Sequence, residues 1–166
     1  YRGAGLAATG LALAFLGVLT NQWAGGSTPA FSLPWMPMLG LDFAVHLDGV
    51  ALFWAWLVVG IGFLVLWYAG YYMEPTDGPQ RFYGALMLFM GSMLGVTISN
   101  NLVLMFVFWE MTSVTSFLLI GHWRHKPGAS AGAKRALLLT GMGGLGLMCG
   151  IAVVAYILRS AGFEGA

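Results

Sequence analysis

The chain has 166 residues, of which 59% are hydrophobic and only 8% carry a charge. Soluble domains contain about 25% charged residues, so a water-soluble surface cannot be built from the seven basic and six acidic side chains present here. A net charge of +1 also excludes the basic footprint of a nucleic-acid-binding protein. The composition therefore indicates an integral membrane protein that contacts the lipid bilayer.

Long uncharged stretches predict an all-α, polytopic bundle of about five membrane-spanning helices. About 20 apolar residues cross a bilayer, and backbone groups in lipid must be hydrogen-bonded within the segment. Residues 82–123 are about twice that length, so we expect a break at the polar cluster 99–101. A signal peptide is the alternative for the first stretch, but that stretch is long and lacks a clear cleavage site. The predicted helices, all in a single transmembrane domain over 1–166, are roughly 3–23, 50–72, 82–99, 102–121 and 136–158.

The loop 24–49 joins the first two predicted helices and contains three prolines and a tryptophan. Within it, apolar residues alternate with Asp42, Ala44 and His46, which favours a short β-ribbon over 39–47. An irregular loop at the membrane interface is the alternative. Asp48, one residue before the next helix, is a typical N-cap residue.

The basic residues predict the orientation of the chain in the membrane. Lysine and arginine collect in cytoplasmic loops, and only Arg159 falls on the side opposite to the rest. We therefore expect a protein of the cell (plasma) membrane, with loop 122–135 in the cytoplasm and loop 24–49 on the outside. The basic residues on the cytoplasmic side are Arg2, Arg81, Arg124, Lys126, Lys134 and Arg135.

Glu110 is the principal candidate functional residue. It lies about 12 Å along its predicted helix at 1.5 Å per residue, near the middle of the membrane. A carboxylate there costs roughly 2.5–3.5 kcal/mol on insertion scales, and ionisable groups in membranes commonly mark ion or proton pathways. Burial raises the pKa of a carboxyl and a nearby cation lowers it. A carboxyl with a mobile cation beside it can therefore load and release a proton.

Three further residues are candidates for work with this carboxyl. Ser113 lies three residues after Glu110, on the same helix face, and is a candidate hydrogen-bond partner. Lys134 and Arg135 are candidate charge partners, although anchoring at the membrane surface is the alternative role. A purely structural Glu110, protonated and hydrogen-bonded to neighbouring hydroxyls, is the alternative to a proton carrier. No spacing of His, Cys or acidic residues indicates a metal site, and no cofactor motif is present.

The segment around Glu110 resembles a known family of membrane proteins. The sequence NNLVLMFVFWEMTSVTSFLLIGHW, over 100–123, is similar to the signature of antiporter-like subunits of Mrp-type multisubunit cation/proton antiporters and of the proton-pumping arm of respiratory complex I. It is closer to the A-type Mrp subunits. The resemblance extends to HLDGVALFWAWLVVGIGFLVLWYAGYYM (46–73), RFYGALMLFMGSMLG (81–95) and GAKRALLLTGMGGLGLM (132–148).

The resemblance implies the N-terminal part of a much larger subunit, with further membrane subunits as partners. In the family a carboxylate at the position of Glu110 works with a lysine two helices later, which would lie beyond residue 166. The implied function is proton translocation in exchange for Na+, in a transporter subunit rather than an enzyme. A proton-pumping subunit of a complex I-like or hydrogenase complex is the first alternative, and a membrane scaffold without an ion path is the second.

Overall fold

The computed structural model describes residues 2–28, 30–36, 41–74, 78–123 and 128–160. These residues form five helices and a two-stranded sheet. Each helix is long and apolar enough to span a membrane, so the helical fold class and the multi-pass membrane assignment are confirmed. In chain order, the elements are α1 (Arg2–Ala24), β1 (Ala30–Met36), β2 (Leu41–His46), α2 (Gly49–Tyr72), α3 (Pro79–Ile98), α4 (Leu102–Ile120) and α5 (Ala129–Ser160).

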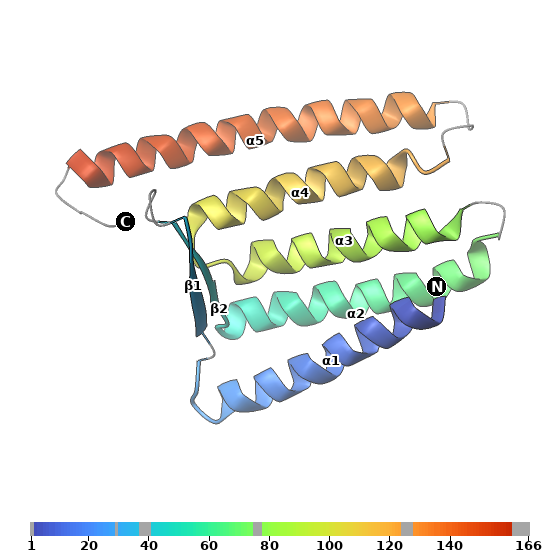
Figure 1. The fold of residues 1–166 in the computed structure, drawn as a ribbon, viewed down its shortest axis with the longest axis horizontal. Helices are drawn as coiled ribbons and strands as arrows, with labels where there is room; N and C mark the ends of the chain where they lie inside the picture. The colour runs from blue at the N-terminus through green and yellow to red at the C-terminus, as the bar shows by residue number, and fades with distance from the viewer. Residues whose placement is uncertain (1, 29, 37–40, 75–77, 124–127, 161–166) are drawn as a thin grey trace.

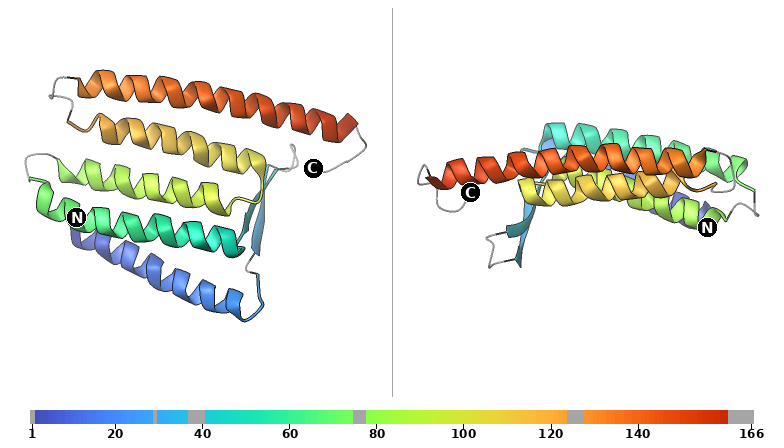
Figure 2. Two further views of the ribbon diagram at one scale, coloured as in Figure 1. Left: turned by 180° about the vertical axis from the view of Figure 1, so that it is seen from behind. Right: turned by 90° about the horizontal axis from the view of Figure 1, so that it is seen from above.

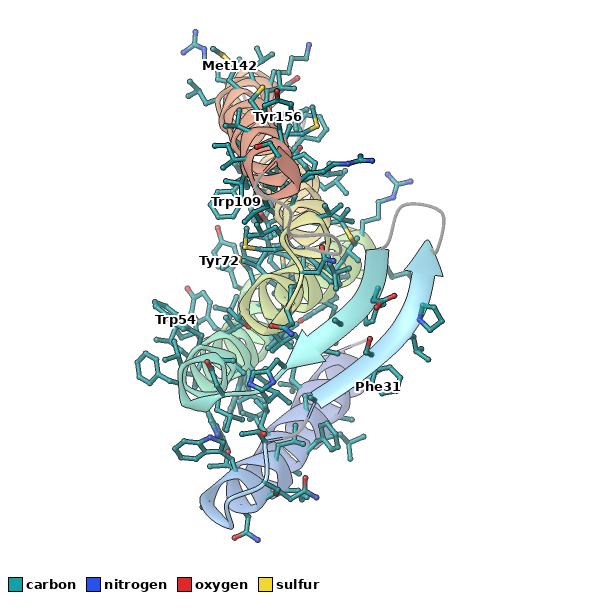
Figure 3. All side chains as sticks on the ribbon, turned by 90° about the vertical axis from the view of Figure 1, so that its left-hand side faces the viewer. Phe31, Trp54, Tyr72, Trp109, Met142 and Tyr156 are labelled. Atoms are coloured by element: carbon teal, nitrogen blue, oxygen red, sulfur yellow. The ribbon has the colours of Figure 1, made fainter. Side chains whose placement is uncertain are left out.

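The helices stand side by side in chain order, each antiparallel to the one before it (Figure 1). Each packs mainly against its sequence neighbours, so the helices form one row (Figure 2). The two faces of the row remain open. Trp54, Tyr72 and Trp109 project from the same face (Figure 3) and are all exposed. Such faces suit contact with lipid or with further helices.

Side chains that fill the space beside glycines bring neighbouring helices together. Met90 of α3 occupies the position that a Cβ at Gly62 of α2 would take. Met90 also belongs to a buried apolar cluster that links these two helices with residues of α1 and α4 packed around it. Small residues allow close approach of this kind in membranes. The buried members of the cluster are Leu66, Ala69, Tyr83, Leu86 and Met90.

The strands form an antiparallel hairpin across the ends of the helices (Figure 1). The register shifts between Pro34 and Met36, where proline lacks the N–H that a regular ladder would use. The strand predicted within 39–47 is confirmed as β2, whereas its partner β1 was not predicted. The backbone N–H of Asn100 donates to the carbonyl of Ala44 at 2.9 Å. This bond ties the hairpin to the turn between α3 and α4.

The predicted N-cap of α2 is confirmed, whereas two helices start at other residues than predicted. Asp48 caps α2, since its carboxylate accepts a hydrogen bond from the Ala51 N–H at 2.7 Å. Two helices start earlier than predicted: α3 at Pro79 rather than about 82, and α5 at Ala129 rather than about 136. Proline suits the first helical position. Alanine, lysine and arginine have good helical propensity and extend α5 ahead of its apolar stretch. Residues 124–127, which carry two of the basic side chains used for orientation, lie outside the described residues.

Candidate functional site

Helix α4 is fixed at its N-terminal end by a cap. The side chain of Asn101 accepts hydrogen bonds from the N–H groups of Val103 at 2.8 Å and Leu104 at 3.3 Å. Asparagine is a favoured N-cap because it satisfies N–H groups that have no partner within the helix. The polar break predicted at 99–101 therefore both ends α3 and starts α4.

An aromatic side chain holds α4 against α3 near the same end. The ring of Phe108 lies where a side chain at Gly95 of α3 would begin, so a Cβ there would lie 2.6 Å from Phe108 Cδ2. The other neighbour of the ring is Phe43 of β2, at a centroid distance of 6.4 Å in an edge-to-face arrangement. Phe108 is thus held between a helix and the hairpin. Phe108 therefore lies on the side of α4 that faces α3, which defines the rotation of α4 about its own axis.

That rotation turns Glu110 toward α5. Two residues along an α-helix correspond to about 200° of rotation, so Glu110 and Phe108 point to opposite sides of α4. The carboxyl group of Glu110 lies against the buried Gly144 of α5. A Cβ at Gly144 would lie 2.8 Å from the carboxyl carbon and 3.5 Å from Oε2, and Oε1 lies nearer still. Glu110 is close to the middle of the 19-residue helix.

One oxygen of this carboxyl group has no hydrogen-bond partner. Glu110 Oε1 is buried without one, and among the described side chains the same is true only of His122 Nε2. Buried polar atoms are hydrogen-bonded in the great majority of cases, and a group without a partner in an apolar region is costly. The site at the α4–α5 contact is therefore suited to receive a proton or a cation from elsewhere.

Ser113 is buried but does not bond to Glu110 in this structure. Its hydroxyl donates to the Trp109 carbonyl at 3.4 Å. The neighbouring hydroxyl of Thr112 donates to the same carbonyl at 2.6 Å. Short hydroxyl side chains in helices readily reach the carbonyls one turn before them, so these two groups are engaged with their own helix. The hydrogen bond predicted between Ser113 and the carboxyl is not formed.

The structure also keeps Lys134 and Arg135 away from Glu110. Both side chains are exposed in the second turn of α5. Ten residues separate Lys134 from Gly144, which corresponds to about 15 Å along the helix axis. Lys134 instead lines a small cavity of about 180 Å³ with residues from the end of α4, including Phe117. The predicted charge pairing is therefore not formed within this part of the chain.

Two protein families together match most of the chain. Residues 99–165 match the family described as NADH:quinone oxidoreductase/Mrp antiporter transmembrane region. Residues 35–83 match the family described as the N-terminus of chain 5 of NADH-ubiquinone oxidoreductase (complex I). The residues that carry the resemblance in the sequence lie within or beside these two matches.

Individual relatives of the chain carry the names of A-type antiporter subunits. It is 46% identical over 137 residues to a probable K(+)/H(+) antiporter subunit of the A/B type from Rhizobium meliloti, covering 82% of this chain and 14% of the relative. It is 41% identical over 130 residues to the A-type subunit of the Na(+)/H(+) antiporter from Alkalihalophilus pseudofirmus, covering 78% of this chain and 16% of the relative. The chain belongs to this family of antiporter-like membrane subunits. It spans less than a fifth of the length of these relatives.

A solved structure of the Mrp complex from Dietzia sp. DQ12-45-1b has the same arrangement of helices. The TM-score is 0.75 at 33% sequence identity, and the match covers 97% of this chain and 18% of the other. Nearly the whole chain therefore has the fold of one part of a much longer chain in that complex.

Two features of the site could not be found from the sequence of this antiporter-like chain. Gly144 lies in a glycine-rich run, where the spacing of Gly146 and Gly150 is the more obvious packing signal. Among the described residues, nothing lies within 4 Å of a Cβ placed at either of those two positions. Likewise, no local signal pairs Phe108 with Gly95. Within the part of the chain that the structure describes, no three His, Cys, Asp or Glu side chains form a group that could hold a metal ion.

Proposed function

We propose that this chain is part of a membrane subunit of a monovalent cation/proton antiporter, in which Glu110 carries the proton. The observation that carries the proposal is the position of the Glu110 carboxyl group. It lies near the middle of α4 and against α5, with a buried oxygen that has no hydrogen-bond partner. The names of the relatives, which are antiporter subunits, support the same assignment.

The proposed mechanism is controlled by charge. A carboxyl group in an apolar region binds its proton more tightly when no cation is near and less tightly when one approaches. Neither Lys134 nor Arg135 is close to Glu110, so we propose that the cation comes from the remainder of the larger subunit. Moving one charge through the membrane potential corresponds to about 2.3 kcal/mol per 100 mV, which is sufficient to drive a stepwise proton transfer.

The distribution of charge supports an orientation in the plasma membrane. Arg81, Lys134 and Arg135 lie near the helix ends opposite the hairpin, whereas Asp42 and Asp48 lie at the hairpin end. Because basic residues favour the cytoplasmic side, we propose that the hairpin faces outward. The turn between α4 and α5 then faces the cytoplasm. Other membrane subunits are the proposed partners, and the role is that of a transporter rather than an enzyme.

The test is cation-driven proton exchange by the intact complex in everted membrane vesicles. A preset pH gradient is dissipated by adding Na+ or, separately, K+, because relatives are named for both cations. We expect Na+ to be the effective ion and Glu110→Gln to abolish exchange while native gels show normal assembly. Asp42→Asn, which makes the same chemical change in an exposed residue of β2, is the matched control. Full exchange in assembled Glu110→Gln complexes would refute the proposal.

A redox-driven proton pump is the second candidate function. It is favoured by the match of residues 35–83 to a complex I subunit family. Purification of the native complex distinguishes the two candidates. Co-purification of iron–sulfur proteins, together with pumping driven by NADH or hydrogen and no response to Na+ or K+, would replace the antiporter assignment.

A further inference from the structure

We propose that Gly144 is a positioning residue for the Glu110 carboxyl group. The absence of a side chain at this position of α5 creates the space in which the carboxyl group lies. The inference rests on the proposed function of Glu110 as proton carrier. It adds that the location of the carboxyl group, and hence its distance from any cation that controls it, is set by the neighbouring helix.

The contact is specific to one glycine of a glycine-rich helix. Among the described glycines of α5, Gly144 alone has atoms near the position of its missing Cβ, and those atoms belong to the carboxyl group of Glu110. Gly143 and Gly146 have nothing within 4 Å. The contact is therefore not explained by a general requirement for small residues along α5.

A side chain at Gly144 would displace the carboxyl group rather than the helices. A Cβ would lie 2.8 Å from the carboxyl carbon of Glu110, closer than real Cβ atoms approach their neighbours. The atoms in the way form the end of a flexible side chain, whose torsions can rotate at modest cost. Phe108 meanwhile keeps α4 in place against Gly95. The expected consequence is a moved carboxyl group in a correctly assembled protein.

Such a displacement is expected to reduce the rate of proton transfer more than it reduces the stability of the protein. Shifting a reacting group by about 1 Å can reduce a rate by about 10²-fold, because proton and charge transfer depend on distance and alignment. A shorter acid at position 110 offers a compensating change. Aspartate withdraws the carboxyl group by one methylene and leaves room for a methyl group at position 144.

The experiment compares five variants of the complete complex. Gly144→Ala is measured beside the matched controls Gly143→Ala and Gly146→Ala, and beside Glu110→Asp with and without Gly144→Ala. Exchange is measured in everted vesicles. The protonated carboxyl band of Glu110, identified by its absence in Glu110→Gln, is followed by infrared spectroscopy as a function of pH.

The expected result is a loss of exchange of about 10²-fold in Gly144→Ala, with a displaced infrared titration and normal assembly. The two control glycine variants stay within about twofold of the unmodified complex, as usual for substitutions that meet no neighbour. The double variant exceeds Gly144→Ala alone by roughly tenfold, since residues in contact couple. If Gly144→Ala fails to assemble, assembly restored by Glu110→Asp supports the same contact.

Two results would overturn the inference. One is an infrared titration and exchange rate in Gly144→Ala equal to those of the control variants. The other is a double variant no better than Gly144→Ala in exchange or assembly. The infrared measurement also separates this inference from the proposed function. Exchange that survives in Glu110→Gln refutes proton carriage, whereas the effect of Gly144 on the carboxyl band is tested independently of transport.

Discussion

Helix α4 contacts its two neighbours in the same way but with different chemistry. On the α3 side the ring of Phe108 fills the space beside Gly95, and on the α5 side the carboxyl group of Glu110 fills the space beside Gly144. The aromatic contact is apolar, is supported by Phe43, and leaves no polar atom without a partner. The carboxyl contact buries an oxygen that has none. The first contact is suited to hold the helix, and the second is suited to function.

Substitution of Gly95 gives the largest expected structural effect. Gly95→Ala places a methyl group against the Phe108 ring, which is a rigid group with Phe43 of the hairpin beside it, so relief requires the ring or the helices to move. Overpacking of this kind costs about 1–3 kcal/mol. We expect reduced thermal stability of the complex and partial recovery with Phe108→Leu. The measurement is a melting curve in detergent, and unchanged stability of Gly95→Ala would show that the two glycine contacts do not differ in rigidity.

Loss of the N-cap of α4 gives a smaller structural effect. Asn101→Ala removes the acceptor for the N–H groups of Val103 and Leu104, at a typical cost of about 1 kcal/mol. Asn101→Asp retains an acceptor and serves as the control. Both variants are compared by melting temperature. Because the cap lies at the hairpin end and not at the α4–α5 contact, we expect the infrared titration of Glu110 to stay unchanged, and a shift would contradict this separation.

Neutralising the two basic residues near the start of α5 is expected to have little or no effect on the infrared titration of the carboxyl group. Lys134→Gln and Arg135→Gln remove exposed charges that lie about 15 Å along the helix from Gly144. We expect each to leave the infrared titration of Glu110 unchanged. A titration displaced in either variant as strongly as in Gly144→Ala would identify that residue as a charge partner.

Removing the hydroxyl of Ser113 gives at most a small effect on exchange. The group donates to the carbonyl of Trp109 rather than to the carboxyl group, so Ser113→Ala removes a bond within one helix. We expect exchange within about twofold of the unmodified complex, the range of substitutions that remove no key contact. Exchange assays in everted vesicles, with Ser130→Ala as the control, measure this directly. A strong loss of exchange would show that Ser113 bonds to Glu110 in another state.

The sequence predicts the helices well, and it singles out Glu110 as a candidate, because both inferences depend on the cost of polar groups in lipid. Length and charge alone locate five spans, and a lone carboxylate within one of them is conspicuous. The β1 strand is harder to predict, since Pro34 interrupts its pattern and its pairing with β2 is a contact between separate segments. The early start of α5 at Ala129 is missed for a related reason. Residues with good helical propensity extend the helix before the apolar stretch begins.

The contacts of Glu110 with other residues could not be predicted from the sequence. Spacing along α4 makes Ser113 a candidate partner, but its hydroxyl donates to the Trp109 carbonyl of its own helix. Their charge makes Lys134 and Arg135 candidate partners, but both lie too far along α5 from Gly144 to contact the carboxyl group. Gly144 is identified only when α4 and α5 are placed side by side. Contacts between helices depend on their rotation, and that rotation is fixed by packing partners such as Phe108.

The central claim is that Glu110 takes up and releases the transported proton. The most direct measurement is infrared difference spectroscopy of the intact complex at fixed pH, before and after addition of the transported cation, with Glu110→Gln as the reference. The account predicts a protonated carboxyl band that is absent from Glu110→Gln and decreases when the cation is added. A band that is identical in both proteins, or that does not respond to the cation, would contradict the account.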